Sequence, residues 1–383
     1  MRHLEWPFFD ASHRELAERV ASLAPSLHQA EGNVDQQTAE CVRQLGVAGL
    51  LRFVVPAPYG GTRESLDVRS LCLIREGLAY ESGLLDFAFA MQGLGTGALS
   101  LFGSEEQKQK YLPPVSRGEK IAAFAISEKN AGSDVAAMQC TAQRTAEGWV
   151  IEGDKTWISN AGIADHYVVF CRIPELGERK FGAFIVDADT RGLSVTERIE
   201  VIAPHVLGSL QFTQCRLPQN ALIGEAGSGL RIALSVLDVF RTTVAAAALG
   251  FARRALSETI RYTSARTQFG KPLAEQQLTQ ARISDMALAV DAAALLVYRA
   301  AWTKDSGAER VTVEAAMAKL FSTEQAQLVI DSAVQLHGGR GVVVGEVVER
   351  LYREIRALRI YEGTSEIQKL VIAGHYLQQQ KPG

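Results

Sequence analysis

The amino-acid sequence predicts an α+β protein in which a β domain lies between two α-helical domains along the chain. Apolar residues recur at every third or fourth position up to about residue 118 and again from Leu230, which is the period of an amphipathic helix. Between these regions the period falls to two, as in a half-buried β-strand. The 383 residues are enough for two or three domains of roughly 100–200 residues each. We therefore expect an N-terminal helical domain at 1–118, a middle β domain at 119–229 and a C-terminal helical domain at 230–383.

The N-terminal domain is predicted from amphipathic segments such as residues 14–20 and 66–80. A turn rich in Pro and Gly at residues 56–61 separates them. Because proline interrupts helices, the pair Pro113-Pro114 is expected to close the domain.

Residues 93–98, Gly-Leu-Gly-Thr-Gly-Ala, match the GxGxxA pattern of dinucleotide-binding folds. That pattern binds a dinucleotide only where a strand precedes it and a helix follows it within a βαβ unit. Here both flanks have the helical period, and no alternation of strands and helices follows. We therefore interpret these glycines as positions of close helix packing.

The middle domain is predicted from short segments of period two at residues 149–153, 166–171, 181–186 and 210–213. Gly, Asp and Pro turns separate them at spacings suited to a small β-sandwich or barrel. In the C-terminal domain, long Ala- and Leu-rich helices run from Leu230 to Gln335. A last helix is expected after Ser365, which forms a Ser-x-x-Gln capping box with Gln368.

The overall composition excludes several classes of function. With 40 basic and 43 acidic residues and a net charge of -3, the chain lacks the positive excess that drives nucleic-acid binding. The five cysteines form no CxxC pair, and no histidines have a zinc-motif spacing such as HExxH. We therefore expect no metal site and no disulfide framework, but buried thiols in a reducing compartment.

The N-terminal sequence has no apolar signal core and carries acidic residues early, so we expect a cytoplasmic protein. The most apolar stretch, residues 244–252, is much shorter than the roughly 20 residues that span a membrane. It is interpreted as part of a buried helix.

Three segments carry candidate chemistry. Residues 125–134, Ala-Ile-Ser-Glu-Lys-Asn-Ala-Gly-Ser-Asp, leave an apolar strand and enter a turn of small residues with hydroxyl and amide donors. Such a turn can wrap a planar or phosphorylated ligand with backbone N–H groups, although a tight β-turn explains the same residues. Lys-Thr-Trp-Ile-Ser-Asn-Ala-Gly follows at 155–162, and Ile-Tyr-Glu-Gly-Thr-Ser-Glu-Ile-Gln stands at 360–368.

In this order, the three segments resemble the acyl-CoA dehydrogenase family over essentially the whole chain. Further matches are Arg-Thr-Gln-Phe-Gly-Lys-Pro-Leu at 266–273, Gln-Leu-His-Gly-Gly-Arg-Gly at 335–341, and Asp238 with Arg241. The resemblance implies a C-terminal four-helix bundle, an FAD cofactor and a homotetramer. It also implies conversion of an acyl-CoA to the trans-2-enoyl-CoA, with electrons passed to an electron-transfer flavoprotein.

The resemblance also assigns roles to individual residues, with Glu362 as the base that removes the α proton. The residues implied in FAD binding are Phe124, Ile126, Ser127, Gly132, Ser133, Trp157, Ile158, Ser159, Arg266, Gln268, Phe269, Gln276, Gln277, Gln335, Leu336, His337, Gly338, Gly339, Thr364, Ser365 and Glu366. Those implied in substrate binding are Ser133, Asp238, Phe240, Arg241, Tyr361 and Gly363.

Two opposing effects act on the pKa of Glu362. The following helix N-terminus favours the carboxylate, whereas burial beside an acyl chain disfavours it. If desolvation dominates, Glu362 becomes a stronger base when substrate displaces water. Some family members place the base directly before the arginine of the first C-terminal helix. That position is Phe240 here, which cannot take a proton. From the local sequence alone, Glu362 also fits an exposed carboxylate at a helix end.

The chain departs from the family pattern at two places. Lys129-Asn130 replace the usual Pro-Gly, so the turn should be less rigid and Asn130 is expected in a left-handed conformation. Residues 202–209 lack the usual Met-Gly followed by Arg-Gly-Ser, which leaves the acyl group, and the choice of CoA or carrier protein, open.

Three alternatives share the resemblance, namely an enoyl-thioester reductase, a flavin monooxygenase and a scaffold without flavin. Retention of Glu362 disfavours the monooxygenase, which needs no such base. It does not separate the reductase from the dehydrogenase.

Overall fold

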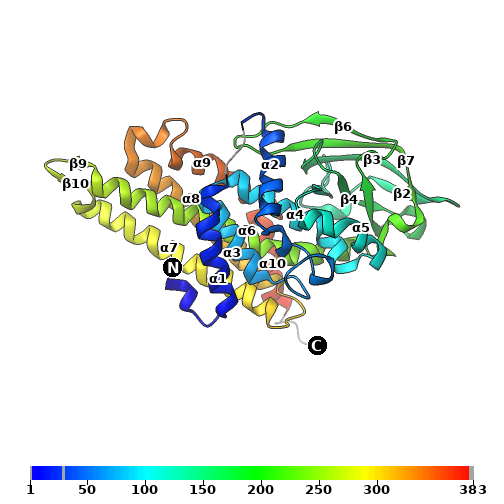
Figure 1. Cartoon of the computed structure of the whole chain (residues 1–383), viewed down its shortest axis with the longest axis horizontal. Coiled ribbons are helices and arrows are strands. Elements are labelled where there is room, and N and C mark those ends of the chain that lie inside the picture. The colour runs from blue at the N-terminus through cyan, green and yellow to red at the C-terminus, as the bar shows by residue number, and fades with distance from the viewer. Residues whose placement is uncertain (1, 28–30, 379–383) are drawn as a thin grey trace. The chain divides into compact units, whose positions relative to one another are not determined.

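The computed structural model describes residues 2–27 and 31–378. Its backbone contacts divide the chain into two compact units. Unit 1 comprises Met1–Ser26, Val68–Asp86 and Arg241–Gly383, and unit 2 comprises Leu27–Asp67 and Phe87–Phe240. Both helices and a β-sheet are present, as the α+β prediction requires (Figure 1).

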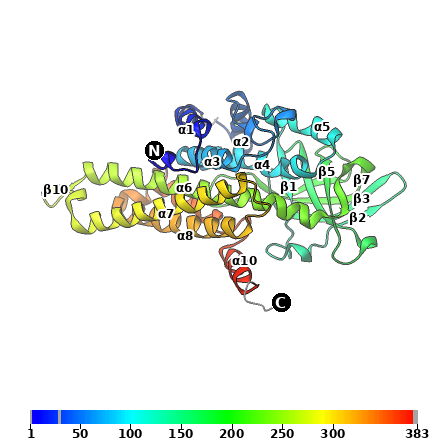
Figure 2. The ribbon, with the colours of Figure 1, turned by 90° about the horizontal axis from the view of Figure 1, so that it is seen from below.

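Unit 1 is helical. Its helices are α1 (Ala11–Leu23), α3 (Val68–Glu81), the C-terminal part of α6 (Gly229–Ala265), α7 (Gln277–Asp305), α8 (Thr312–His337), α9 (Val347–Leu358) and α10 (Ser365–Gln378). A two-residue hairpin of β9 (Thr267–Gln268) and β10 (Lys271–Pro272) joins α6 to α7. Figures 1 and 2 both show α6, α7 and α8 as long helices lying side by side.

The buried faces of α6, α7 and α8 in unit 1 are built largely from alanines. Buried alanines are found at 245–248 on α6, at 293–294 and 300–301 on α7, and at 315, 316 and 318 on α8. Because alanine has the highest helix propensity and the smallest methyl-bearing side chain, these helices are stable and can approach closely. Close approach leaves the larger and charged side chains of this core with few, well-defined positions.

Unit 2 contains α2 (Val34–Val47), α5 (Glu105–Ser116), most of α4 (Gly83–Phe102) and an eight-stranded sheet. The strand order is β6-β7-β3-β2-β4-β5-β8, and β1 pairs in parallel with β4. The strands are β1 (Ala122–Ala125), β2 (Thr141–Arg144), β3 (Gly148–Ser159), β4 (His166–Arg172), β5 (Phe181–Asp187), β6 (Leu193–Arg198), β7 (Leu207–Pro218) and β8 (Leu222–Gly227). Each of the four predicted strand segments lies within or overlaps one of them.

The glycines of the GxGxxA match lie inside α4, where they serve helix packing as expected. A Cβ added at Gly93 would come 2.5 Å from Phe240, and one at Gly95 would come 2.7 Å from Ala122. Real Cβ atoms do not approach so closely, so glycine is required for α4 to lie this near its neighbours in unit 2.

Two expectations about helix boundaries are wrong by a turn or less. Pro113 and Pro114 lie inside α5, which ends only at Ser116. In α10 the hydroxyl of Thr364, one residue before Ser365, accepts from the backbone N–H of Ile367 at 3.3 Å. The Ser365 hydroxyl instead donates to Glu324, so the cap begins one residue earlier than the capping-box pattern predicted.

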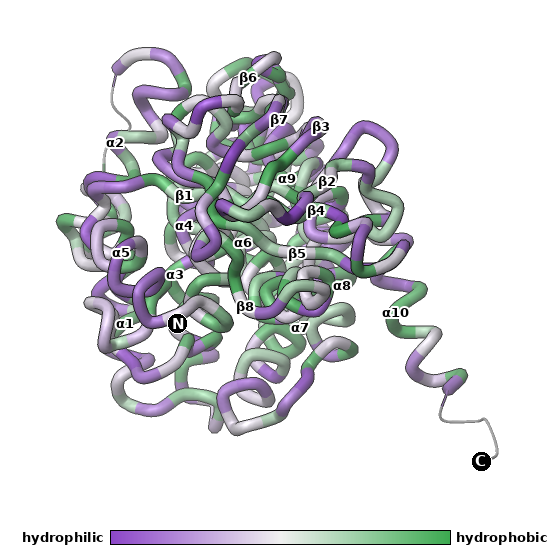
Figure 3. The backbone as a smooth tube through the Cα atoms, turned by 90° about the vertical axis from the view of Figure 1, so that its right-hand side faces the viewer, coloured by the Kyte–Doolittle hydropathy of each residue, from purple (hydrophilic) through white to green (hydrophobic). Residues whose placement is uncertain are grey.

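The apolar helices are longer than the stretch at 244–252 suggested. By length and composition, α4 and α6 could each cross a membrane, but 94% and 78% of their apolar windows are buried within the protein. Figure 3 shows the hydrophobic colouring along α6. Burial to this extent is typical of core helices.

Candidate active site

The loop of residues 361–364 joins α9 to α10 and has an unusual backbone. Glu362 has φ of 53° and Gly363 has φ of 94°, so two successive residues are left-handed. This conformation is unfavourable for a residue with a Cβ, and it persists only where surrounding contacts fix it. At Gly363, an added Cβ would also come 2.6 Å from Gln368 Nε2.

Donors from three helices fix this loop through its carbonyl groups. Arg241 Nε, on α6, donates to the carbonyl oxygen of Glu362 at 3.2 Å. Lys319 Nζ, on α8, donates to that of Gly363 at 2.8 Å. Gln368 Nε2, on α10, donates to Gly363 at 2.9 Å and to Glu362 at 3.4 Å. Arg241 is therefore a buried loop contact, although its spacing from Asp238 also fitted a surface ion pair.

The carboxylate of Glu362 takes no part in holding the loop. Its Oε2 is enclosed and has no hydrogen-bond partner among the described residues, although the residue as a whole is half-buried. Burial raises the pKa of Glu362, and the nearby cations Arg75, Lys319 and Arg241 oppose this rise. An enclosed carboxylate of raised pKa and without a partner has the properties of a general base.

A buried ion pair lies close to this carboxylate. Arg75, on α3, binds Asp86 through Nε at 2.8 Å and Nη2 at 2.7 Å, and its Nη1 donates to Thr243 at 3.0 Å. Arg75 and Asp86 are both almost fully buried. Because the pair is bidentate, Asp86 offsets much of the charge that Arg75 presents to Glu362.

A second candidate site in unit 1 is a cavity of about 520 Å³. It is lined by Tyr262, Arg266, Gln268, Leu273, Gln335, Leu336, His337, Gly338, Gly339 and Arg340. The structure thus brings together, in one cavity, seven residues that the family resemblance assigned to the cofactor: Arg266, Gln268, Gln335, Leu336, His337, Gly338 and Gly339.

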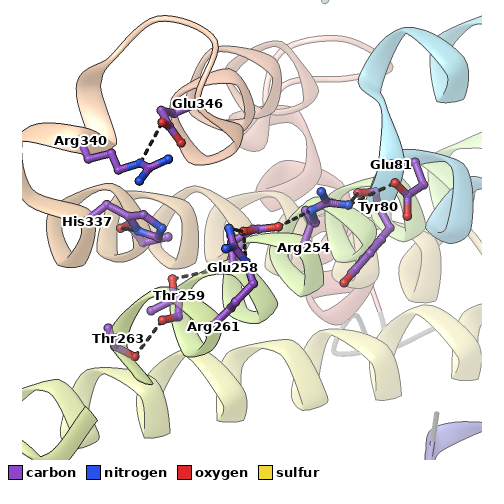
Figure 4. A network of polar contacts seen from close by, with 12 residues as sticks. Tyr80, Glu81, Arg254, Glu258, Thr259, Arg261, Thr263, His337, Arg340 and Glu346 are labelled. Atoms are coloured by element: carbon purple, nitrogen blue, oxygen red, sulfur yellow. Dashed lines mark hydrogen bonds and ion pairs between the residues drawn. The ribbon is translucent and has the colours of Figure 1, made fainter. Parts of the chain in front are cut away.

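The geometry of this cavity fits an anionic, partly aromatic ligand. The His337 ring stacks on Tyr262 with centroids 4.3 Å apart, and its Nδ1 donates to the Ala333 carbonyl at 2.7 Å. No atom lies within 4 Å of a Cβ built on Gly338 or Gly339, so their backbone is open to a ligand. Arg266 supplies a fork of donors suited to phosphate. Figure 4 shows His337 beside the threonines of α6 and Arg340 paired with Glu346.

Six further predicted cofactor residues of unit 1 are not part of the lining of this cavity. Phe269 is 94% exposed with φ of 52°, at the tip of the β9–β10 hairpin. Gln276 and Gln277 stand at the start of α7. Thr364, Ser365 and Glu366 lie at the start of α10, at the end of the 361–364 loop.

In unit 2, the turn at 125–134 is held by a buried ion pair. Glu128 accepts from Lys155 Nζ at 2.8 Å and from the backbone N–H groups of Gln139 at 2.5 Å and Cys140 at 3.0 Å. Lys155 also donates to the Ile126 carbonyl at 3.0 Å. Gly132 and Ser133 are exposed on this turn. The left-handed conformation expected at Asn130 is absent, and two backbone hydrogen bonds of 3.1 Å between Glu128 and Ala131 close the turn around it.

The predicted residues on β3 have an unusual backbone of their own. Trp157 is left-handed with φ of 59° and is 57% exposed, while its neighbour Ile158 is buried. The Ser159 hydroxyl lies 2.9 Å from His205 Nε2, whose ring centroid is 3.8 Å from that of Phe87. Thr156 N–H donates to the Ser127 carbonyl at 3.0 Å and ties β3 to the turn.

The other predicted residues of unit 2 are buried or half-buried. Phe124 and Ile126 belong to the core around β1, and Phe124 packs on Phe170 with centroids 4.8 Å apart. Phe240 is buried beside Gly93, and Asp238 is half-buried one helical turn before Arg241.

Sequence reasoning missed Lys319, Arg75 and the Glu128–Lys155 pair. Lys155 and Glu128 belong to two of the candidate segments, but they are 27 positions apart and no local pattern predicts that they pair. Lys319 lies in the alanine-rich first half of α8, and a single lysine among buried alanines is the only available signal. Arg75 and Glu76 were similarly visible as charges within the buried stretch of α3.

Comparison with known proteins gives consistent matches over the whole chain. Models of the N-terminal, middle and C-terminal domains of acyl-CoA dehydrogenases match residues 8–119, 123–215 and 227–377. The chain is 39% identical to the mitochondrial short-chain specific acyl-CoA dehydrogenase of Homo sapiens, covering 88% of this chain and 82% of the relative. It is 36% identical to the 3-(aryl)acrylate reductase of Clostridium sporogenes, covering 88% and 90%.

Solved structures agree with these relatives. Butyryl-CoA dehydrogenase from Megasphaera elsdenii superposes with a TM-score of 0.89 at 30% identity, over 96% of this chain and 99% of that one. A chain from a structure described as the electron transferring flavoprotein of Acidaminococcus fermentans superposes with a TM-score of 0.90 at 32% identity, over 97% and 99%.

Proposed function

The chain belongs to the acyl-CoA dehydrogenase family and is an FAD-dependent enzyme, and we propose that it oxidises a short-chain acyl-CoA to the trans-2-enoyl-CoA with Glu362 as the base. One observation carries the assignment of the base. Among the described residues, the Oε2 atom of Glu362 is enclosed and has no hydrogen-bond partner, on a loop in which side chains hold the carbonyls of Glu362 and Gly363. A carboxylate oxygen without a protein donor is available to a substrate proton.

The protein's own residues prepare this proton transfer. Burial raises the pKa of Glu362, which makes its carboxylate a stronger base. Arg75, Lys319 and Arg241 oppose that rise and favour the ionised carboxylate. The left-handed backbone at Glu362 and Gly363 directs both carbonyls to their donors. Its fixed shape holds the carboxylate in one place before substrate binds.

The residues present fit the flavin cofactor. In unit 1, the open backbone of Gly338 and Gly339, the Arg266 guanidinium and the His337–Tyr262 stack suit a pyrophosphate and an adenine. In unit 2, the predicted contacts of the flavin ring stay Ser127, Ser133, Trp157 and Ser159. When bound, the flavin supplies the hydride acceptor for the β carbon.

The proposed substrate is a short, unbranched acyl-CoA, because the relatives and structures compared above include short-chain and butyryl-CoA dehydrogenases. A second candidate is the reverse reaction, reduction of an enoyl thioester, which the similarity to the Clostridium reductase supports. In both directions Glu362 exchanges the proton of the carbon next to the thioester.

We further propose a cytoplasmic homotetramer that delivers electrons to an electron-transfer flavoprotein. Large apolar side chains exposed in unit 1 support assembly, among them Phe269, Leu278, Leu288, Val344 and Leu370. Exposed apolar groups that recur along one set of helices are typical of subunit interfaces. Analytical ultracentrifugation that finds only monomers would exclude this assembly.

An anaerobic titration tests the reaction. The purified protein, mixed with acetyl-, butyryl-, hexanoyl- and octanoyl-CoA in turn, should lose flavin absorbance most rapidly with butyryl-CoA. The E362Q variant should keep FAD and lose at least ~10²-fold in the rate of flavin reduction, the usual contribution of a general base. Reduction of E362Q at the wild-type rate would remove Glu362 from the mechanism. Reoxidation by crotonyl-CoA faster than reduction by butyryl-CoA would favour the reductase.

A further inference from the structure

A buried lysine holds the loop that carries Glu362. Lys319 is 0% exposed, and its Nζ donates to the carbonyl oxygen of Gly363 at 2.8 Å. Within the described residues Lys319 forms no ion pair, so a neutral carbonyl is its bonded partner. An ammonium group is costly to bury, and a buried lysine is normally paired with a carboxylate. Packing alone does not explain a charged residue at this position.

The bond from Lys319 to the loop restrains the backbone next to Glu362. The bond to Gly363 constrains the second of the two left-handed residues, and Arg241 constrains the carbonyl of the first. Gln368 is the other donor to the Gly363 carbonyl, but it belongs to α10, which follows the same loop. Lys319 therefore ties the loop to a separate long helix, α8.

We propose that Lys319 is a positioning residue that fixes the left-handed Glu362–Gly363 backbone and, through its charge, holds the Glu362 side chain in its ionised form. This inference rests on the proposed role of Glu362 as the base. Lys319 acts through the loop and does not contact the reacting atoms.

The charges around the loop support the second part of this role. Burial lowers the pKa of Lys319 to about 8, and the charge of Glu362 opposes that shift. Arg75 also faces Glu362, but its charge is offset by the bidentate contact with Asp86. The charged groups that act on Glu362 or Lys319 are Arg75 on α3, Asp86 on α4, Arg241 on α6, Glu324 on α8 and Glu366 on α10.

Hydrogen exchange on the holoenzyme tests the positioning role without turnover. In K319M the amides of residues 359–368 should exchange at least ~10-fold faster than in the wild type, because one charged hydrogen bond no longer opposes opening. The control is T323V, which removes a buried hydroxyl one turn further along α8 that bonds only within that helix. T323V should exchange as the wild type does at these amides. Unchanged exchange in K319M would overturn the positioning role.

The pH dependence of flavin reduction by butyryl-CoA tests the electrostatic role. K319M should lower the maximal rate by at least ~10-fold while leaving KM within about threefold, since only the base is disturbed. Its acidic limb should move to higher pH, because losing a cation raises the pKa of Glu362 further. A lower rate with an unmoved acidic limb would show that Lys319 is only structural.

The reciprocal measurement does not depend on K319M folding. In E362Q, with lysine 13C-labelled at Cε, the pKa of Lys319 should fall below its wild-type value of about 8, because coupling between two sites is mutual. An unchanged titration would refute the coupling. If the wild type is reduced by no acyl-CoA, the proposed function fails while the exchange and titration results still judge Lys319.

Discussion

Two fully buried lysines, one in each unit, are used in opposite ways. Lys155 in unit 2 binds the carboxylate of Glu128 at 2.8 Å, and the pair fixes the turn at 125–134. Lys319 in unit 1 bonds to a backbone carbonyl, while the Oε2 atom of Glu362 has no hydrogen-bond partner among the described residues. The first arrangement neutralises both charges, and the second leaves a charge acting on a neighbouring base. Burial of a lysine therefore does not by itself indicate a structural or a functional role; its partner does.

The largest expected effect is loss of stability when the paired lysine is removed. K155M leaves Glu128 buried beside two backbone donors and without its counter-ion, which typically costs 3–5 kcal/mol, or about 4 kcal/mol here. Urea unfolding monitored by circular dichroism would measure the loss. E128Q/K155M should recover part of it, because no unpaired charge remains. A loss under about 1 kcal/mol in K155M would mean that the pair is solvated and the comparison does not hold.

A smaller effect is expected from the ionisation of the unpaired lysine. Its folded pKa is about 8, below the value of 10.5 for an exposed lysine. Between these values the unfolded chain holds the proton and the folded protein does not, so stability rises with pH in that window and the gain is lost as pH falls to about 8. From pH 8 to pH 9 the wild type should gain about 1 kcal/mol relative to K319M. Paired urea titrations at the two pH values would detect it. If the free energy of unfolding changed equally in the two proteins from pH 8 to pH 9, Lys319 would not titrate in that range.

The sequence predicted the local structure around these two lysines better than their long-range contacts. Strand segments such as 149–153 and 166–171 fall within β3 and β4, because period-two alternation is a local signal. Glu362 was also predicted from a local signal, the Gly-Thr-Ser sequence that follows it directly. The contacts of Lys319 and Lys155 were not predictable, because their partners lie 44 and 27 positions away. The predicted cap at Ser365 was wrong for a related reason, since Glu324 lies 41 positions away and accepts the hydroxyl that the local pattern assigned to the cap.

The smallest expected effect is the change in stability of K319M at neutral pH. Methionine fills a similar volume without a charge to desolvate, which favours the variant, whereas the loop loses one hydrogen bond, which disfavours it. These terms are each about 2–3 kcal/mol and opposite in sign, so the net change at pH 7 should stay within about 1 kcal/mol. Chemical denaturation beside K155M under identical conditions gives the direct contrast. If K319M were as unstable as K155M, both lysines would be structural. If K319M keeps wild-type stability but loses rate, a buried charge has been retained for the chemistry of Glu362 and at no benefit to the fold.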